Sequence, residues 1–190
     1  MSLNKYNQKR HFNSTTEPKG EIKKSNNELI FVVQKHAASH LHYDFRLEMD
    51  GVLKSWAIPK GPSMDPEHKR LAIMVEDHPY DYKDFEGTIP DGNYGAGNVI
   101  VWDRGTYTPA DKDYKGDVET QLQSELEKGH LRFILNGEKL KGEFALVKFK
   151  SKQDTTWLLI KKNDQYATEE DILKNNKSVI SNLTLEEMEQ

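Results

Sequence analysis

The stretch HLHYDFRLEMDG, from His40 to Gly51, alternates between two kinds of side chain. Every even position from His40 to Asp50 is charged or titratable, and every odd position from Leu41 to Met49 is apolar. A period of two is typical of a β-strand, whose successive side chains point to opposite faces. The pattern predicts a strand with one apolar face and one face that carries imidazoles, carboxylates and a guanidinium.

The dipeptide 50–51, Asp-Gly, predicts a tight hairpin after this strand, because a type I′ turn needs positive φ at both central positions. In the register that follows, Phe45 faces Trp56 on the apolar side and Arg46 faces Ser55 on the polar side. The small partner across from Arg46 leaves open room above the guanidinium, so we expect Arg46 to contribute little to the core. The same register pairs Tyr43 with Ile58 and Asp44 with Ala57.

Seven further runs have strand character, and eight short strands in one domain suggest an antiparallel β-barrel or a strongly curled sheet. One helix is expected over 117–129, with Asp117 as N-cap and Gly129 beyond its end. A weaker helix would start at Thr168. The expected fold class is therefore mainly β, an antiparallel barrel of about eight strands with one or two flanking helices. The further runs are 28–36, 52–59, 69–77, 98–107, 130–137, 142–150 and 155–162.

The length of 190 residues suits one domain, which divides into a polar N-terminal arm (1–27), the barrel (28–167) and an acidic tail that is helical or frayed (168–190). Hydrophobic residues make up 35% and charged residues 31%, as in a soluble globular protein. No apolar run approaches the roughly 20 residues of a membrane helix, and no signal-peptide pattern opens the chain. We therefore expect a cytoplasmic protein.

The absence of cysteine excludes disulfides, thiolate nucleophiles, cysteine-type zinc sites and iron–sulfur clusters. Any bound metal must therefore use His and carboxylate ligands. The net charge of -4 argues against a strongly basic nucleic-acid-binding surface. Because acidic residues concentrate after Asn163, residues 1–162 are nearly neutral. The net charge therefore does not exclude a local basic groove that binds nucleic acid.

His42 and Asp44, two residues apart on one strand face, are spaced to share a metal ion. His36 comes shortly before this strand, and His78 follows another strand beside a proline. A solvent-exposed polar face would also explain the alternation, but Lys, Glu, Thr and Ser are commoner choices for one. We assign no ligand role to His40, although it lies on the same face.

Phosphate chemistry needs positive charge beside the metal, because the non-bridging oxygens carry negative charge through the transition state. Arg46 on the hairpin, Lys60 in IPKGPS and Arg70 in HKRLAIMVED are the candidates. With the three histidines and Asp44 they predict a metallo-phosphoesterase pocket. The glycine-rich segment 85–97 lacks the Walker spacing, and turn geometry explains its glycines.

Two other classes of function fit part of this set. Two His and one carboxylate on a β-barrel also describe the facial triad of non-haem iron oxygenases, which would not need the converging cations. A non-catalytic DNA-end-binding module is the third interpretation. It predicts that alanine at His42 would change metal affinity alone.

Long segments of the chain closely resemble the 3′-phosphoesterase of prokaryotic DNA ligase D, over about Tyr6 to Ala167. They are FVVQKHAASHLHYDFRLEMDGVLKSWAIPKGPS, VEDHPYDYKDFEGTIPDGNYGAGNVIVWDRGTY and LKGEFALVKF with WLLIKKNDQYA. Because the chain shows neither ligase nor polymerase modules, it resembles a stand-alone form of that enzyme.

The resemblance implies a manganese-dependent enzyme that heals DNA 3′ ends in nonhomologous end joining, with other divalent transition metals as possible substitutes. It would cut a phosphodiester to remove a 3′-terminal ribonucleoside from a primer strand, and would then remove the remaining 3′-phosphate. The partner would be duplex DNA with such a primer end. A separate ATP-dependent DNA ligase and end-binding repair proteins are further expected partners of a monomeric enzyme.

The resemblance also implies roles for particular positions. Family members commonly have an acidic residue where this chain has His11 in KRHF, which puts an acidic role there in doubt. His78 would be an acid or a transition-state donor. The implied metal ligands are His36, His42 and Asp44; the scissile phosphate would be held by Arg46, His78 and Tyr82; Gln34, Ser55, Lys60, Arg70 and Glu76 would complete the pocket; and Arg10 and Glu17 would close over it from the arm.

Overall fold

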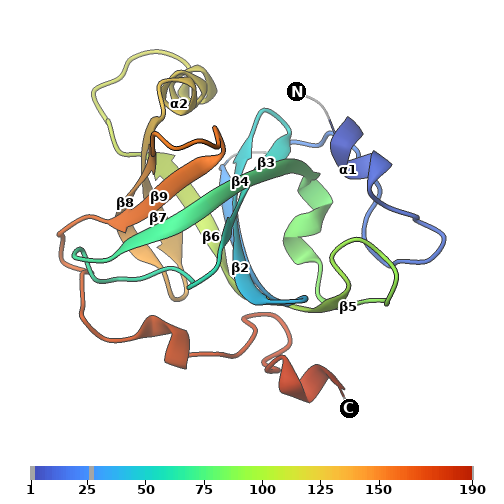
Figure 1. Cartoon of the computed structure of the whole chain (residues 1–190). Helices are drawn as coiled ribbons and strands as arrows, with labels where there is room; N and C mark the ends of the chain where they lie inside the picture. The colour runs from blue at the N-terminus through green and yellow to red at the C-terminus, as the bar shows by residue number, and fades with distance from the viewer. Residues whose placement is uncertain (1–2, 26–27, 190) are drawn as a thin grey trace.

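The computed structural model of the protein describes residues 3–25 and 28–189 (Figure 1). The predicted arm and tail extend to Met1, Ser2, Asn26, Asn27 and Gln190, which lie outside the described residues. The strands are β1 (Ile30–Ala37), β2 (Leu41–Met49), β3 (Val52–Ile58), β4 (Lys69–Pro79), β5 (Gly87–Ile89), β6 (Gly97–Pro109), β7 (His130–Gly137), β8 (Lys141–Lys148) and β9 (Thr156–Lys161). The α-helices are α1 (Asn4–Gln8) and α2 (Val118–Glu127), and the 3-10 helices are η1 (Tyr80–Asp84), η2 (Ile172–Lys174) and η3 (Glu186–Glu189).

Eight of the described strands close into an antiparallel barrel. The order β1-β2-β3-β4-β9-β8-β7-β6 returns to its start because β6 also pairs with β1, and β5 is an extra strand beside β6. The predicted mainly β class, an antiparallel barrel of about eight strands with one or two flanking helices, is confirmed. β5 was not predicted because its three residues are too short to show an alternation.

The predicted hairpin has the expected turn and register. Asp50 and Gly51 have φ of 52° and 79°, the positive values that a type I′ turn requires. Phe45 lies opposite Trp56, and the remaining predicted pairs are also formed. The two faces of β2 are therefore assigned as the sequence indicates.

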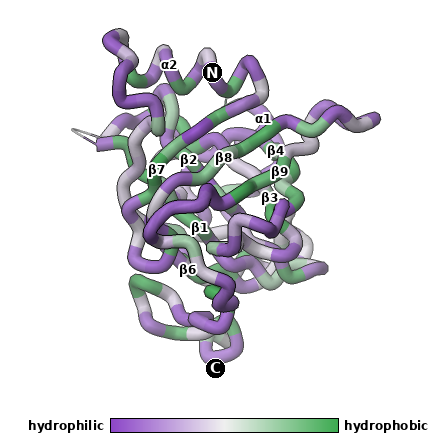
Figure 2. The backbone as a smooth tube through the Cα atoms, turned by 90° about the vertical axis from the view of Figure 1, so that its left-hand side faces the viewer, coloured by the Kyte–Doolittle hydropathy of each residue, from purple (hydrophilic) through white to green (hydrophobic). Residues whose placement is uncertain are grey.

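The interior of the barrel holds the main hydrophobic core. Phe45 stacks on Phe133 at 5.8 Å between ring centroids, and Trp56 meets Trp157 edge-on at 5.9 Å. Figure 2 shows hydrophobic residues along the strands and mainly hydrophilic residues in α2 and the tail. The side chain of Asp117 caps α2 by accepting from a backbone N–H, as predicted.

A second hydrophobic cluster lies on the outer side of the barrel, where α1 faces β3 and β4 in Figure 1. It joins the outer faces of β1, β3 and β6 to the N-terminal arm, η1 and β5. This cover is what separates the polar face of β2 from water. Its buried members are Leu3, Tyr6, Val32, Val52, Leu53, Tyr82, Phe85, Ile89, Val99 and Val101.

The C-terminal tail runs along the bottom of the barrel in Figure 1. The indole N–H of Trp102 donates to the carbonyl of Asn175 at 2.7 Å, Ser178 donates to Glu86, and Leu185 is buried. In place of an α-helix from Thr168, the tail has the 3-10 turns η2 and η3. Among the described residues, no helix has the length and apolar character needed to cross a membrane.

Candidate active site

The candidate metal ligands meet on the outer face of the β1–β2 pair. His42 and Asp44 come from β2, and His36 lies directly opposite His42 on β1. The two imidazole rings are 4.8 Å apart between centroids. The spacing of His42 and Asp44 predicted that these two residues of one strand could share a metal ion. Antiparallel pairing of β1 with β2 adds His36 from the neighbouring strand.

Backbone carbonyls fix the orientation of both imidazoles. His36 donates from Nε2 to the carbonyl of Gly95 at 2.7 Å, and His42 donates from Nδ1 to the carbonyl of His40 at 2.9 Å. Each ring therefore turns its free nitrogen toward Asp44, 3.5 Å from Oδ2 in both cases. Two ligands about 2.1 Å from a shared ion at a tetrahedral angle lie about 3.4 Å apart. The three residues fit a divalent metal ion, and their ligand atoms all lie within 4.8 Å of one another.

Arg46 lies behind these ligands with all of its guanidinium nitrogens paired. It donates from Nε to Gln34 and from Nη1 to Ser55, both at 2.8 Å, and its Nη2 is 3.2 Å from Asp44. The residue is 2% exposed, with the ring of Tyr82 at 4.9 Å. The expectation of open room above Arg46 is therefore wrong, because η1 covers this face.

The charge of Asp44 is held by its neighbours. Burial raises the pKa of this carboxyl, but the Arg46 guanidinium, together with the polar side chains of His36 and His42 beside it, outweighs burial and holds the pKa well below its usual value. Asp44 is therefore ionised at neutral pH. An ionised carboxylate is the form that binds a metal.

Gln34 and Tyr82 connect the sheet to the elements that cover it. Gln34 donates to the carbonyls of Tyr82 and Phe85 at 2.8 and 2.9 Å, which fixes η1 over the site. The hydroxyl of Tyr82 donates to Glu17 at 2.9 Å. Burial, and then the charge of Glu17, raise the pKa of Tyr82 well above its usual value, so the hydroxyl stays protonated.

A β-bulge in β4 turns His78 toward the site. The register shifts between Leu53 and Ser55, so that His78 and Val75 both lie opposite residues on the outer side of β3. His78 donates from Nδ1 to the carbonyl of Glu76 at 3.0 Å. Its Nε2 therefore accepts the hydrogen bond from the arm at 3.2 Å.

His78 is neutral in this arrangement. It is 5% exposed, and burial, followed by the charges of Arg46 and Arg10, lowers its pKa well below the usual value. A neutral imidazole with Nδ1–H committed to a carbonyl presents a lone pair at Nε2. His78 therefore receives a hydrogen bond at Nε2 here, in contrast to the donor role expected from the resemblance.

The N-terminal arm supplies the donor to His78. Arg10 donates from Nη2 to His78, from Nε to Glu17 at 2.9 Å, and lies 3.4 Å from Glu76 through Nη1. Its guanidinium stacks on the ring of Tyr6 at 3.8 Å. The arm thus closes over the pocket through buried charge pairs, while the neighbouring residue 11, a histidine, is exposed.

These residues surround a cavity of about 300 Å³. Most of the predicted site residues line it, and Gln34, Ser55 and Glu17 hold the lining residues from behind. Ile89, Tyr94 and Gly95 complete the wall toward β5. The predicted residues in the lining are Arg10, His36, His42, Asp44, Arg46, Glu76, His78 and Tyr82.

Two predicted residues, Lys60 and Arg70, are not brought to this pocket. Lys60 is exposed in the turn after β3. Arg70 precedes the bulge and shares the alternation of Ala72, which packs into the barrel core. It lines a separate cavity with residues 63, 68 and 169–173. The positive charge at the candidate site comes instead from Arg46 and Arg10.

Sequence reasoning missed the supporting role of Glu48, the last acidic residue on the polar face of β2. Glu48 is buried and accepts the backbone N–H groups of Ser25 and Ile30, which fastens the arm to the barrel. It also missed the Gly95 carbonyl and the ring of Tyr6. A backbone carbonyl acceptor cannot be recognised from the residue type. A single aromatic residue in a polar segment is only a weak indication of a site residue.

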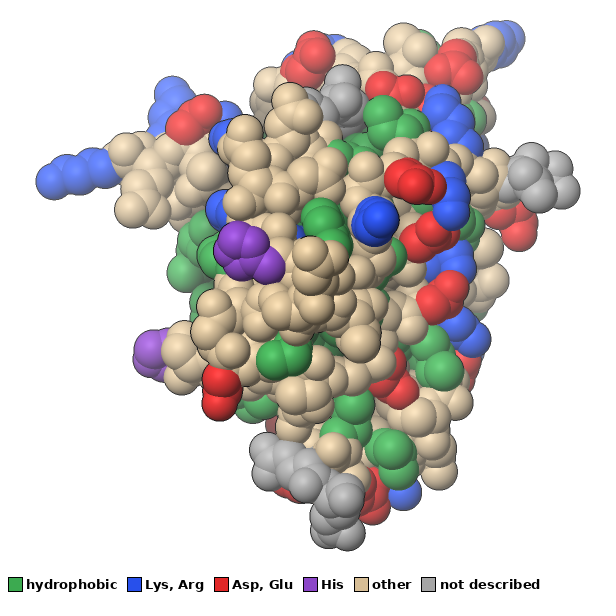
Figure 3. Space-filling model, turned by 90° about the vertical axis from the view of Figure 1, so that its right-hand side faces the viewer, with side chains coloured by type: hydrophobic (Ala, Val, Ile, Leu, Met, Phe, Trp, Pro, Cys, Tyr) green, Lys and Arg blue, Asp and Glu red, His purple; other side chains and the backbone are tan. Residues whose placement is uncertain are grey.

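The surface around the arm carries charges of both signs. On the side of the molecule shown in Figure 3, basic and acidic side chains alternate along one edge. Exposed ion pairs among the described residues include Lys23 with Asp81 and Arg104 with Asp84. The cations that an anionic ligand could meet in the pocket are the guanidiniums of Arg10 and Arg46, which lie beside the carboxylates of Asp44 and Glu76.

Comparison with known proteins places these residues in a family. The model of the DNA Ligase D 3′-phosphoesterase domain matches residues 34–148, which include every candidate site residue outside the arm. The chain is 53% identical over 191 residues to the multifunctional non-homologous end joining protein LigD of Pseudomonas aeruginosa, covering 96% of this chain and 22% of that protein. It is 40% identical over 164 residues to the protein of the same description from Mycolicibacterium smegmatis, covering 86% of this chain and 21% of that protein.

The multifunctional non-homologous end joining DNA repair protein LigD of Mycobacterium tuberculosis is 42% identical over 147 residues, covering 77% of this chain and 18% of that protein. The chain thus spans about a fifth of the length of the curated relatives it matches. The family match, the barrel and the clustered histidines agree with one another. The chain belongs to the DNA ligase D 3′-phosphoesterase domain family.

Proposed function

We propose that this protein is a divalent-metal-dependent phosphoesterase of DNA 3′ ends, acting in nonhomologous end joining. It removes a 3′-terminal ribonucleoside from a primer strand and then the remaining 3′-phosphate, with manganese as the expected metal. The observation that carries the proposal is the pair of oriented imidazoles facing Asp44, beside Arg46 and a neutral His78. The family description and the printed names of the relatives support the reaction class and the repair context.

His36, His42 and Asp44 would hold the divalent ion, which would supply Lewis-acid chemistry toward a phosphoryl oxygen and a water molecule. The donor set mixes imidazole with carboxylate, which suits several first-row metals. The choice of manganese rests on the family resemblance.

The guanidinium groups are placed to hold an anionic substrate. Arg46 is pre-organised by Gln34 and Ser55, so it needs no rearrangement to present its charge. Arg10 brings a second cation from the arm. A scissile phosphate in the cavity would lie next to both these charges and the metal ligands.

His78 accepts a proton at Nε2 in this proposal. Since its Nδ1–H is committed to the Glu76 carbonyl, the imidazole must first gain a proton at Nε2 before it can pass one to a leaving oxygen. Arg10 keeps this nitrogen hydrogen-bonded when the arm is closed. The healed end would carry the 3′-hydroxyl that a DNA ligase joins, which makes a separate ligase an expected partner.

The iron oxygenase alternative uses the same two histidines and carboxylate. Two buried guanidiniums at the pocket, from Arg10 and Arg46, favour an anionic substrate over it. The non-catalytic end-binding alternative predicts that no product is formed from the primer. One assay of product formation therefore distinguishes both alternatives from the proposal.

The test is a labelled primer-template that ends in one ribonucleotide, incubated with chelator-treated protein and with or without manganese. We expect a shortened primer with a 3′-phosphate and then a 3′-hydroxyl, with manganese only. His42→Ala should abolish both products, while the matched variant His40→Ala should keep them, because His40 contributes its carbonyl and its side chain is exposed. Intact primer with every divalent metal, or oxygen consumption with iron, would contradict the proposal.

A further inference from the structure

The loop between β5 and β6 carries an exposed aromatic residue at the mouth of the catalytic cavity. Tyr94 is 50% exposed and lines the cavity that contains His36 and His42. Its neighbour Gly95 supplies the carbonyl that orients His36. Tyr94 is therefore adjacent in sequence to the carbonyl group that orients the candidate metal ligand His36.

The backbone fixes where this loop places its side chain. Gly95 and Gly97 have φ of 76° and 139°, values that other residues rarely adopt. A Cβ on Gly97 would lie 2.0 Å from the carbonyl oxygen of Ala37, so the loop is seated tightly on β1. Tyr94 itself belongs to neither hydrophobic cluster of the described residues. Core packing therefore does not account for an aromatic residue at this position.

Positive charges of the arm surround the same ring. The Lys9 ammonium lies 4.4 Å from the ring centroid of Tyr94 and 3.3 Å from its hydroxyl, and the Arg10 guanidinium lies 5.7 Å from the centroid. An aromatic platform flanked by cations is the arrangement that binds bases and phosphates of nucleic acid ends. Half of the Tyr94 side chain stays exposed to solvent beside these cations.

We propose that Tyr94 is a stacking platform for the terminal nucleobase of the primer, a binding subsite next to the reacting phosphate. The inference rests on the proposed function and names the part of the substrate that the mouth of the site recognises. A terminal base has one face that its own strand leaves unstacked. Because every base has such a face, stacking positions the end without selecting its sequence, which an enzyme for broken ends requires.

The test compares wild type and Tyr94→Ala on two primers, one with and one without the base of the terminal nucleoside. Loss of one base–aromatic stack should raise KM on the normal primer by roughly 5- to 150-fold, with a smaller effect on kcat. On a primer whose terminal ribose has no base, wild type should lose the same factor, and Tyr94→Ala should add less than about twofold. Tyr94→Phe and Tyr94→Trp should retain tight binding, since both keep an aromatic face.

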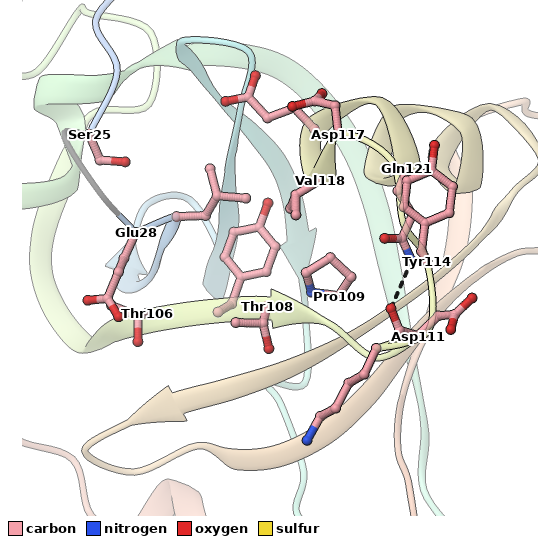
Figure 4. Close-up of a pocket in the computed structure, with 14 residues that line it drawn as sticks. Ser25, Glu28, Thr106, Thr108, Pro109, Asp111, Tyr114, Asp117, Val118 and Gln121 are labelled. Atoms are coloured by element: carbon pink, nitrogen blue, oxygen red, sulfur yellow. Dashed lines mark hydrogen bonds between the residues drawn. The ribbon is translucent and has the colours of Figure 1, made fainter.

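Tyr114→Ala is the matched control. Tyr114 is 43% exposed and lines a different pocket, between β6 and α2, as Figure 4 shows. Its loss should leave KM unchanged on both primers. Equal losses for Tyr94→Ala with and without the terminal base would overturn the stacking platform.

A binding measurement separates this inference from the proposed function. A primer-template with 2-aminopurine at the 3′ terminus should be quenched by wild type and by Tyr94→Phe in a metal-free chelating buffer, but not by Tyr94→Ala. Quenching without product release under any metal would overturn the proposed function and support the subsite. Product release with equal quenching by wild type and Tyr94→Ala would overturn the subsite alone.

Discussion

The two faces of β2 are both buried, yet they differ in what buries them. The odd face, with Phe45, packs against other strands inside the barrel. The even face, with Asp44 and Arg46, is covered from outside by the arm and η1. The inner contacts are apolar and join strands of the same sheet, whereas the outer contacts are hydrogen bonds and ion pairs to segments far away in the chain. We therefore expect the odd face of β2 to contribute mainly to stability and the even face to contribute to the proposed chemistry.

The largest expected contrast comes from truncating one residue on each face. Phe45→Ala should lower the free energy of unfolding by about 3 to 5 kcal/mol, because it leaves a cavity among stacked rings. His42→Ala should change stability by less than about 1 kcal/mol and reduce phosphoester cleavage by more than about 1000-fold. Denaturant unfolding and the primer assay measure the two effects. A severe loss of stability in His42→Ala would remove the separation between the faces.

Arg46→Lys should lower both the stability of the fold and the rate of phosphoester cleavage. One ammonium cannot serve Gln34, Ser55 and Asp44 together, so cleavage should fall by roughly 30- to 1000-fold. Stability should also fall, by about 1 to 3 kcal/mol, because buried partners lose hydrogen bonds. Arg104→Lys, in an exposed ion pair, is the control and should change neither. Normal cleavage by Arg46→Lys would take Arg46 out of the phosphate-binding role.

The neutral state of His78 predicts a pH dependence of folding in the metal-free protein. Its pKa in the folded state lies well below the usual 6.5, so the unfolded chain binds a proton that the folded chain does not. Stability should therefore fall as pH drops below about 6.5, by up to about 1.4 kcal/mol per pH unit from this group. His78→Gln should flatten the slope and the exposed control His130→Gln should not, as measured by unfolding between pH 5 and 8. Identical slopes in all three proteins would contradict a buried neutral His78.

The smallest expected effect concerns the contact between η1 and the arm. Tyr82→Phe removes one hydrogen bond to Glu17 while Arg10 still pairs with that carboxylate. The arm should open more readily by about 0.5 to 1.5 kcal/mol, seen as faster amide exchange in residues 3–20 with unchanged exchange in β2. Tyr166→Phe, at an exposed position, serves as the control. Unchanged exchange in the arm would show that Arg10 alone holds it.

The parts of the fold predicted from sequence are those decided by neighbours in the chain. Positive φ at Asp50 and Gly51 follows from local turn chemistry, and the register of the hairpin follows from the turn. The candidate ligands His42 and Asp44 lie on the same short segment, so their meeting depends on strand period alone. His36 joins them through the adjacent pairing of β1 with β2.

The parts that could not be predicted depend on contacts across the chain. Tyr82 and Glu17 are 65 residues apart, and no periodicity indicates that the arm folds back onto η1, so that only the family resemblance implied a closed arm. The bulge in β4 breaks the alternation, so that Arg70 on one side of it and His78 on the other face different ways despite their even spacing. Both residues were expected at one pocket, Arg70 as a candidate cation and His78 as a candidate phosphate contact, and the extra residue in β4 separates them.

The three histidines around the cavity are all oriented by main-chain carbonyls, those of His40, Gly95 and Glu76. An alanine scan deletes side chains and leaves every one of these acceptors in place. Such a scan would report residue 40 as dispensable although its carbonyl sets the tautomer of a candidate ligand. Substitutions that alter the backbone conformation would reveal the role of these carbonyls. Replacement of Gly95 is an example, because its φ is 76° and a new Cβ would lie 3.4 Å from the ring of His36. Tolerance to substitution at these positions is therefore a poor guide to their part in the chemistry.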